Sequence, residues 1–237
     1  MIRAVFFDFY GTLAGWQPAP ERVQHEACAA EGLDVPEAAL ARAYRTANDY
    51  MDAENARKHI ATRSPVERDA FFTEYERRLL EAAGAAVPPE QAARIWERVA
   101  KAPKAIGLYP ETLPALEALR SVGLTLGVIS NMDIGLSDTL ARLGIAPYLS
   151  ASVSSGEVGI SKPHVRIFEA ALRKAGVGRR EALHVGDGYD SDIVGARNAG
   201  IAALLLVRDG HLPPGGVPAV ASLLDVLPYL RANELVP

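Results

Sequence analysis

The chain has 237 residues, of which 49% are hydrophobic, and a formal net charge of −4. This suits one large α/β domain or a core domain with a smaller insert. The acidic balance, without a cluster of Lys and Arg, argues against a nucleic-acid partner. No run approaches the ~20 apolar residues that span a bilayer, and the first residues lack a signal-peptide pattern, so we expect a cytoplasmic protein with no membrane partner. The single cysteine, Cys28, excludes an intrachain disulfide and is expected in a core.

Residues 2–9 form a short, almost wholly apolar run, which predicts a strand covered on both faces, as in a parallel sheet flanked by helices. Gly11 permits a sharp turn directly after this strand. From 18 to 101, apolar residues recur at helical spacing and no β run is evident, which predicts an insert of about four helices. Their starts are expected at prolines, namely Pro20, Pro36, Ser64–Pro65 and Pro88–Pro89.

Strands and helices alternate in the rest of the chain, and each predicted helix is followed by a glycine that can serve as its C-cap. Repeated β-α units of this length predict a doubly wound parallel sheet with right-handed crossovers. We therefore expect a Rossmann-like α/β core made of 1–17 and 102–237, with an all-α insert at 18–101. The predicted elements of the second core segment are helix 111–122, strand 124–130, helix 134–143, strand 149–153, helix 164–175, strand 182–186, helix 190–199 and strand 201–207.

Polar residues follow the predicted strands. Asp8 ends the first strand, Ser130 and Asn131 end the second, Lys162 follows the third, and Asp187 ends the fourth. Since ligands of open α/β sheets bind beyond the carboxyl ends of the strands, these side chains predict one site. Each has a simpler alternative, because an acid can cap a helix, a Ser-Asn pair can form an ordinary turn, and a lysine can be a solvated surface group.

The residue types indicate the chemistry. A carboxylate on a rigid strand end, Asp8, can act as a nucleophile and form a covalent ester intermediate. Asp8 and Asp187 repel each other unless a hard cation lies between them. Mg²⁺ suits two carboxylates, several waters and a backbone carbonyl, which Tyr10 would supply.

The remaining residues are expected to bind the substrate anion. The hydroxyls of Thr12 and Ser130, with backbone N–H groups around Gly11 and Asn131, would hold its oxygens. Lys162 would offset the charge that builds up on the nucleophile and on the transferred group.

In their order and spacing these segments resemble the haloacid dehalogenase superfamily of hydrolases. The matching segments are Asp8–Leu13, Val128–Asn131, Ser161–Pro163 and Gly186–Asp187 with Asp192–Ala196. The resemblance frames the core, about two thirds of the chain, and implies that the helical insert is the family's cap. It implies that Asp8 is the nucleophile, that Ser130 and Lys162 bind the transferred group, and that Asp187 is a metal ligand. Asp192 would support Lys162 or the water shell of the metal.

Tyr10 departs from the phosphatases of this family, which carry a second aspartate there as a general acid. The family's 2-haloacid dehalogenases have tyrosine at this position, and a halide leaving group needs no proton. Tyr10 therefore favours hydrolysis of a carbon–halogen bond.

Asp187 favours the opposite interpretation. Those dehalogenases work without metal and lack the Gly-Asp pair that Gly186–Asp187 retains, and a metal on Asp8 would aid attack on a dianionic phosphate but hinder attack on a haloacid. We predict a Mg²⁺-dependent hydrolase of small phosphomonoesters. A metal-independent (S)-2-haloacid dehalogenase and a catalytically weak metal- or phosphate-binding relic are the alternatives.

The substrate itself is not encoded in these segments, and neither is the oligomeric state. By the resemblance, specificity is expected to depend on the helical insert. Its candidate contacts are Arg42, Tyr44, Arg45, Tyr50, His59 and Arg63, although arginines on a helical insert are more often solvated surface groups.

Overall fold

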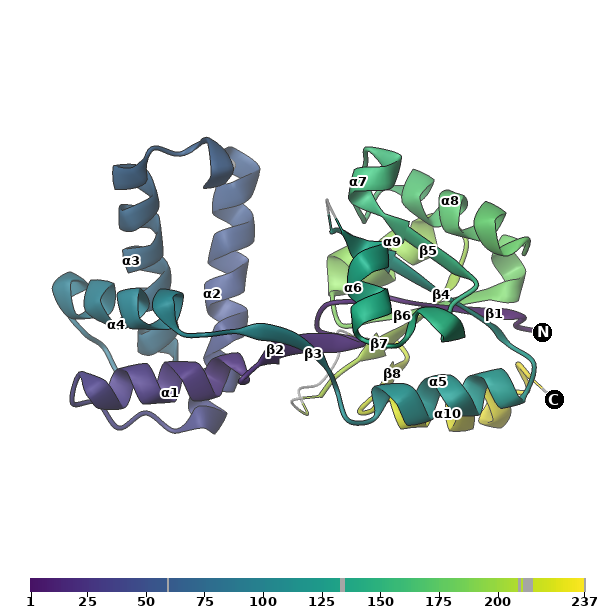
Figure 1. Ribbon diagram of the computed structural model, residues 1–237, viewed down its shortest axis with the longest axis horizontal. Helices are drawn as coiled ribbons and strands as arrows, with labels where there is room; N and C mark the ends of the chain where they lie inside the picture. The colour runs from purple at the N-terminus through teal and green to yellow at the C-terminus, as the bar shows by residue number, and fades with distance from the viewer. Residues whose placement is uncertain (59, 133–134, 209, 211–214, 237) are drawn as a thin grey trace. The chain divides into compact units, whose positions relative to one another are not determined.

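The computed structural model describes residues 1–58, 60–132, 135–208, 210 and 215–236. The chain forms two compact units, Met1–Gly15 with Ile106–Pro237, and Trp16–Ala105 (Figure 1). Two paired strands join them, β2 (Ala14–Gln17) and β3 (Ala105–Leu108). The limits expected from the sequence, 17 and 102, lie two and four residues from those of the structure.

The first unit, the sheet unit, contains a six-stranded sheet in which every neighbouring pair of strands is parallel. The sheet confirms the predicted α/β fold. Its first strand lies near the centre, so the residue that follows this strand has neighbours on both sides. In spatial order the strands are β5 (Ala151–Ser154), β4 (Thr125–Ser130), β1 (Ala4–Phe7), β6 (Ala182–Gly186), β7 (Ala202–Leu206) and β8 (Ala219–Val220).

Helices cover both faces of the sheet, which explains why its strands are almost wholly apolar. Val5 and Phe7 pack on one face, whereas Ala4 and Phe6 pack on the other. Each buried phenylalanine contributes about 1.5–3 kcal/mol. In Figure 1, α5 and α10 lie together on one side of the sheet and α8 on the other. The helices are α5 (Thr112–Ser121), α6 (Leu136–Arg142) and α10 (Val226–Ala232) on the first face, and α8 (Val165–Ala175) and α9 (Gly195–Asn198) on the second.

Several short elements differ from the predicted ones. The predicted helix 190–199 is a π-helical turn, Tyr189–Val194, followed by the one-turn α9; such turns often occur at functional sites. Residue 134, the expected start of α6, lies outside the described residues. Elements without a sequence prediction are β2, β3, β8, α7 (Ser155–Val158), α10, and the 3₁₀ turns Ile60–Thr62, Ala146–Tyr148, Arg179–Glu181 and Leu223–Asp225.

The second unit, the helical unit, holds four α-helices in its described part, as expected. They are α1 (Pro20–Ala30), α2 (Glu37–Arg57), α3 (Pro65–Ala82) and α4 (Pro89–Lys101). Each begins at or directly after a predicted proline, because proline at the first turn loses no helical hydrogen bond. Ser64 and Glu67 form a capping box at the start of α3.

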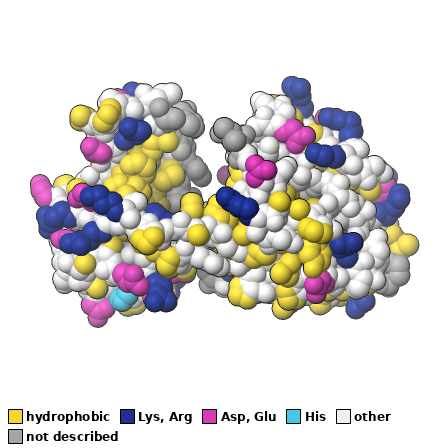
Figure 2. Space-filling view, in the orientation of Figure 1, with side chains coloured by type: hydrophobic (Ala, Val, Ile, Leu, Met, Phe, Trp, Pro, Cys, Tyr) yellow, Lys and Arg dark blue, Asp and Glu magenta, His cyan; other side chains and the backbone are white. Residues whose placement is uncertain are grey.

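The core of the helical unit is apolar, with Leu40, Leu79 and Ile95 fully buried and Cys28 among them. Figure 2 shows hydrophobic side chains gathered over α2 and α3. Aromatic rings stack in this unit, with 4.2 Å between the ring centroids of Phe72 and Trp96. Across the described residues, every helix is too short or too polar to cross a membrane.

Candidate active site

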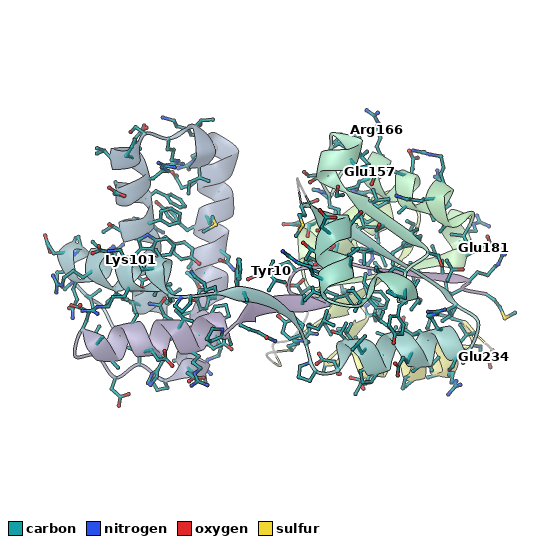
Figure 3. The ribbon with its side chains drawn as sticks, in the orientation of Figure 1. Tyr10, Lys101, Glu157, Arg166, Glu181 and Glu234 are labelled. Carbon is teal, nitrogen blue, oxygen red and sulfur yellow. The ribbon has the colours of Figure 1, made fainter. Side chains whose placement is uncertain are left out.

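The polar residues singled out in the sequence follow neighbouring strands. Asp8 comes directly after β1, Ser130 is the last residue of β4, and Asp187 comes directly after β6. Because β4, β1 and β6 are adjacent and parallel, their carboxyl ends meet at one edge of the sheet. Figure 3 shows Tyr10 at this end of the sheet unit and Glu181, which precedes β6, at the opposite end.

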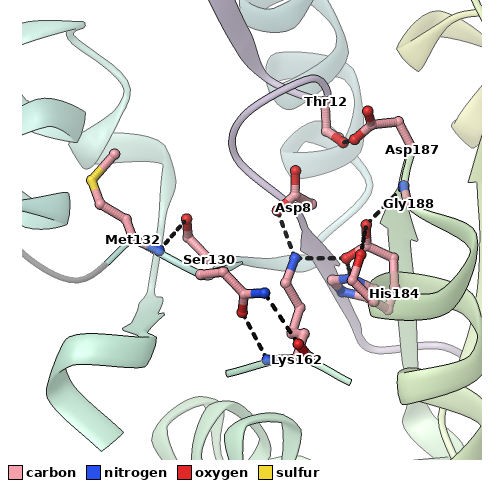
Figure 4. A network of polar contacts seen from close by, with 11 residues as sticks. Asp8, Thr12, Ser130, Met132, Lys162, His184, Asp187 and Gly188 are labelled. Atoms are coloured by element: carbon pink, nitrogen blue, oxygen red, sulfur yellow. Dashed lines mark hydrogen bonds and ion pairs between the residues drawn. The ribbon is translucent and has the colours of Figure 1, made fainter. Parts of the chain in front are cut away.

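Lys162 joins two buried carboxylates. Its Nζ lies 2.6 Å from Asp8 Oδ1 and 2.6 Å from Asp192 Oδ1 (Figure 4). The exposed fractions of the three side chains are 2%, 10% and 2%. A buried lysine that donates to two carboxylates is held by charge-assisted hydrogen bonds, and removal of one partner leaves an uncompensated buried charge.

Asp192 is bound on both of its oxygens. Oδ1 accepts from Lys162 and lies 2.8 Å from His184 Nε2, while Oδ2 accepts from the Gly188 N–H at 3.0 Å and from the Ser191 hydroxyl at 3.3 Å. Gly186 must lack a side chain here, since a Cβ would overlap the Asp192 carboxyl. Both oxygens of Asp192 are therefore occupied, and Asp192 holds the Lys162 ammonium group that also donates to Asp8.

Asp187 stands at the solvent side of the site and is held by the loop after β1. The Thr12 hydroxyl donates to Asp187 Oδ1 at 3.0 Å. Gly11 has φ of 89°, and a Cβ there would collide with the Asp187 carboxylate. The glycine therefore permits both the turn and the close approach of the second acid.

The carboxylates of Asp8 and Asp187, with the charge of Asp192 close by, suit a hard cation. One oxygen of each lies within 4.8 Å of the others. Asp187 uses Oδ1 for Thr12 and Asp8 uses Oδ1 for Lys162, which leaves the second oxygen of each for a cation within the described part of the chain. One buried and one exposed carboxylate, which leave room for several waters, are a donor set that Mg²⁺ prefers.

Burial and neighbouring charges shift the pKa values of the three carboxylates. Burial raises the pKa of Asp8 even though Lys162 opposes the shift, and the Asp192 and Asp187 carboxylates raise it further. Burial also opposes ionisation of Asp192, but the Lys162 cation and the His184 hydrogen bond hold its pKa below the usual range. Asp187 reaches solvent, yet the surrounding protein and Asp192 raise its pKa. Lys162 is thus a cation between two competing acids.

Asn131, which was expected to bind the substrate, also holds the loop that carries Lys162, whereas Ser130 bonds within its own loop. The Asn131 side chain accepts from the Lys162 N–H at 2.7 Å and donates to the Lys162 carbonyl at 3.1 Å. Ser130 Oγ accepts from the Met132 N–H at 3.3 Å, so its own hydrogen remains available to donate. The role of Ser130 and Asn131 toward a substrate stays a prediction.

The loop after β1 closes on itself through internal hydrogen bonds. The Gly11 N–H, expected to face the substrate anion, donates to the Ala14 carbonyl at 2.8 Å, because the turn from Tyr10 to Ala14 closes on itself. The Thr12 hydroxyl donates to Asp187, and the roles of Gly11 and Thr12 toward a substrate stay predictions. Tyr10 is 44% exposed, and its roles as a metal ligand or catalytic residue stay predictions.

Arg208 was not singled out in the sequence, although it contacts the same loop. Its guanidinium donates to the carbonyls of Gly11 at 2.8 Å and Thr12 at 2.9 Å, pairs with Glu111 at 2.7 Å, and lies 4.0 Å from the ring centroid of Tyr109. The loop after the candidate nucleophile is therefore anchored to the segment that follows β3. A lone arginine after a predicted strand carries no signal of such a contact.

The specificity candidates in the helical unit have partners within that unit. Tyr44 donates to the Pro20 carbonyl, Arg63 pairs with Glu54, and Tyr50 stacks on Phe71. Arg42 is exposed, whereas His59 and the side chain of Arg45 lie outside the described residues.

Comparison with known proteins finds similarity to hydrolases. A family model described as haloacid dehalogenase-like hydrolase matches residues 2–200. A glyceraldehyde 3-phosphate phosphatase of Methanothermobacter thermautotrophicus is 44% identical over 99 residues, 41% of this chain and 44% of the relative. A phosphoserine phosphatase of Thermus thermophilus is 39% identical over 133 residues, 56% of this chain and 53% of the relative. The chain spans about half the length of these curated relatives.

A solved structure matches over nearly the whole chain. The 2-haloacid dehalogenase of Pseudomonas syringae pv. Tomato DC3000 covers 99% of this chain and 100% of its own, with 28% identity and a TM-score of 0.57. Phosphatases and a dehalogenase thus both resemble the chain.

Proposed function

The chain belongs to the haloacid dehalogenase-like hydrolases, and we propose that it is a Mg²⁺-dependent hydrolase of small phosphomonoesters with Asp8 as the nucleophile. One observation carries the proposal. Three carboxylates gather around a single lysine, so that when ionised they exceed its charge by two. A divalent cation offsets that excess, whereas a phosphate dianion alone would be repelled.

In the proposed reaction each residue of the site has a chemical role. One oxygen of the Asp8 carboxylate attacks phosphorus, a phosphoryl–aspartate ester forms, and the bond from phosphorus to the leaving oxygen breaks. Water then cleaves the ester and regenerates the carboxylate. Lys162 stabilises the charge on Asp8 and on the transferred group, and the Ser130 hydroxyl donates to a phosphoryl oxygen. Mg²⁺ on Asp8 and Asp187, with the Tyr10 carbonyl, would supply positive charge next to the phosphoryl oxygens.

Tyr10 stands where a general acid would protonate the leaving oxygen. That proton must come from water, from the substrate or from another residue. Because loss of one general acid costs about 10²–10⁴ in rate, we expect slow turnover of alkyl phosphates and faster turnover of aryl phosphates.

The second candidate is metal-independent dehalogenation of a 2-haloacid. Tyr10 favours it, and so does the likeness to the dehalogenase of Pseudomonas syringae. Asp187 opposes it, because a cation held there would bind the Asp8 carboxylate and weaken its attack on carbon.

The decisive experiment measures phosphate release from an aryl phosphate with Mg²⁺ and with chelator, beside chloride release from 2-chloropropionate. Asp8→Asn is the control for both. Mg²⁺-dependent phosphate release that Asp8→Asn abolishes supports the proposal. Metal-independent chloride release refutes it in favour of the dehalogenase, and inactivity in both assays with retained Mg²⁺ binding indicates a relic.

The substrate panel starts from the relatives' names. Glyceraldehyde 3-phosphate and phosphoserine are the first compounds to test, since phosphatases of these substrates resemble the chain. We propose that the helical unit governs the choice among them, and Arg42→Ala, which changes an exposed side chain of that unit, tests this through KM.

A further inference from the structure

His184 lies in the middle of β6, opposite Phe6 of β1 and Ala203 of β7. The exposed fraction of His184 is 0%. Its imidazole makes an edge-to-face contact with the ring of Phe168, with 5.2 Å between the two ring centroids. An apolar residue would fill this place at the centre of a sheet without the cost of burying polar atoms. A histidine at this place is therefore best explained by a hydrogen bond that its imidazole makes.

The partner of His184 determines where the ring carries its proton. Nε2 lies 2.8 Å from Asp192 Oδ1, while Nδ1 has no partner within the described part of the chain. An ionised carboxylate only accepts, so Nε2 must be the donor. A second proton on Nδ1 would leave a buried N–H without an acceptor, which costs more than an idle lone pair. The arrangement specifies the neutral ring with hydrogen on Nε2.

Asp192 Oδ1 is shared by the two donors His184 and Lys162, and Lys162 in turn is shared by Asp192 and Asp8. All four groups are buried. Without His184, Lys162 is the one donor to Asp192 Oδ1 that remains among the described residues, so the carboxylate draws the ammonium group toward itself. The lysine is then less able to neutralise Asp8 and the group transferred to it.

We propose that His184 is a positioning residue, which donates from Nε2 to Asp192 and thereby keeps Lys162 on Asp8. The catalytic consequence rests on the proposed function, whereas the proton location does not. The alternative is that His184 only fills space between β6 and α8.

Two substitutions separate these roles. His184→Phe keeps a ring of similar size and removes the donor, whereas the side-chain amide of His184→Gln can place an N–H where Nε2 stands. We expect His184→Phe to lower kcat about 10–100-fold with a smaller change in KM, and His184→Gln to recover most of the loss. Leu183→Ala on the same strand, whose side chain belongs to the cluster on the opposite face of the sheet, is the control for general destabilisation, with thermal midpoints measured for all variants.

Wild-type kcat in His184→Phe, or equal losses in His184→Phe and His184→Gln, would overturn the proposal in favour of packing. If the variants do not fold, ¹⁵N NMR of the histidine rings in the wild-type protein decides instead. The neutral Nε2–H tautomer supports the proposal, and an Nδ1–H or doubly protonated ring refutes it. If the wild-type protein releases no phosphate, the proposed function fails, but the NMR result still decides the state of His184.

Discussion

Each unit of the molecule buries an acid, but the two acids have opposite surroundings. Asp192 in the sheet unit has four donors among the residues that the structure describes, one of them a lysine, and its pKa is lowered although burial opposes ionisation. Glu76 in the helical unit is 0% exposed and accepts from Gln24, and its Oε2 has no partner within the described residues. Burial raises the pKa of Glu76 to about 8 even though Gln24 opposes the shift.

The difference shows what a buried carboxylate requires in order to stay charged. Burial disfavours ionisation in both units, and only the sheet unit supplies a cation and enough N–H and O–H donors to reverse it. The partners of Asp192 therefore keep that carboxylate charged, whereas burial without such partners favours the neutral form of Glu76.

The largest effect is expected from Asp8→Asn, which removes the nucleophile from the charged cluster. Turnover should fall by roughly 10⁴-fold or more, because an amide cannot form the ester intermediate. Circular dichroism and the thermal midpoint should show a folded protein. Turnover near the wild-type value would refute the nucleophile assignment.

Lys162→Met should destabilise the chain by about 3–5 kcal/mol, since two buried carboxylates lose their shared cation. Urea unfolding at pH 7 measures this change. Lys174→Met is the matched control, because Lys174 pairs with Glu157 at the surface, and it should change the free energy of unfolding by no more than about 1 kcal/mol. Equal effects of the two substitutions would remove the distinction between the buried and the exposed pair.

Glu76→Gln should abolish a pH dependence of stability that belongs to the helical unit. The folded-state pKa of about 8 lies above the ordinary value of 4.5, so the folded state binds the extra proton between these values. The stabilisation is complete below about pH 4.5 and is lost as the pH rises toward 8, by an amount on the order of 5 kcal/mol. Amide hydrogen exchange in α3 at pH 5 and pH 8 measures it, with the exposed Glu97→Gln as control. A wild-type protein whose α3 is equally protected at both pH values would contradict the neutral acid.

Tyr10→Asp adds a carboxyl group where the family's phosphatases carry a general acid. If protonation of the leaving group limits the rate, hydrolysis of alkyl phosphates should rise by about 10–100-fold, while that of aryl phosphates should change little. Steady-state kinetics on matched alkyl and aryl substrates tests this. No gain with preserved Mg²⁺ binding would mean that the proton has another source.

The smallest effect is expected from Ser64→Ala, at the exposed start of α3. The substitution removes the acceptor for the Glu67 N–H and should cost about 1 kcal/mol. Urea unfolding at pH 7 measures the change. A loss as large as that of Lys162→Met would show that the helical unit also depends on single polar contacts.

Patterns with strong local causes were predictable from the sequence. The buried strands are apolar on both faces, and prolines mark the helix starts, so the sheet and the four helices follow from short windows of sequence. Strands β2 and β3 were not predictable, because each has four residues and is defined by its partner about 90 residues away.

The site was predictable as a set of residues but only partly in its contacts. Asp8, Lys162 and Asp187 occupy strand ends or adjoining loops, which topology brings together. Thr12 bonds to Asp187 after another strand, and His184 bonds to Asp192 in the turn that follows its own strand. No spacing in the sequence indicates either contact.

The separation of the site residues along the chain has a consequence for biosynthesis. Asp8 and Lys162 are 154 positions apart, and Thr12 and Asp187 are 175 apart. Such contacts form late, because the intervening chain must first be ordered or looped out. A growing chain on the ribosome carries the proposed nucleophile from the start, but Lys162 follows 154 positions later and Asp187 only after β6 has been made. Hydrolytic activity would therefore require the folded sheet, and truncated or misfolded chains would be inactive.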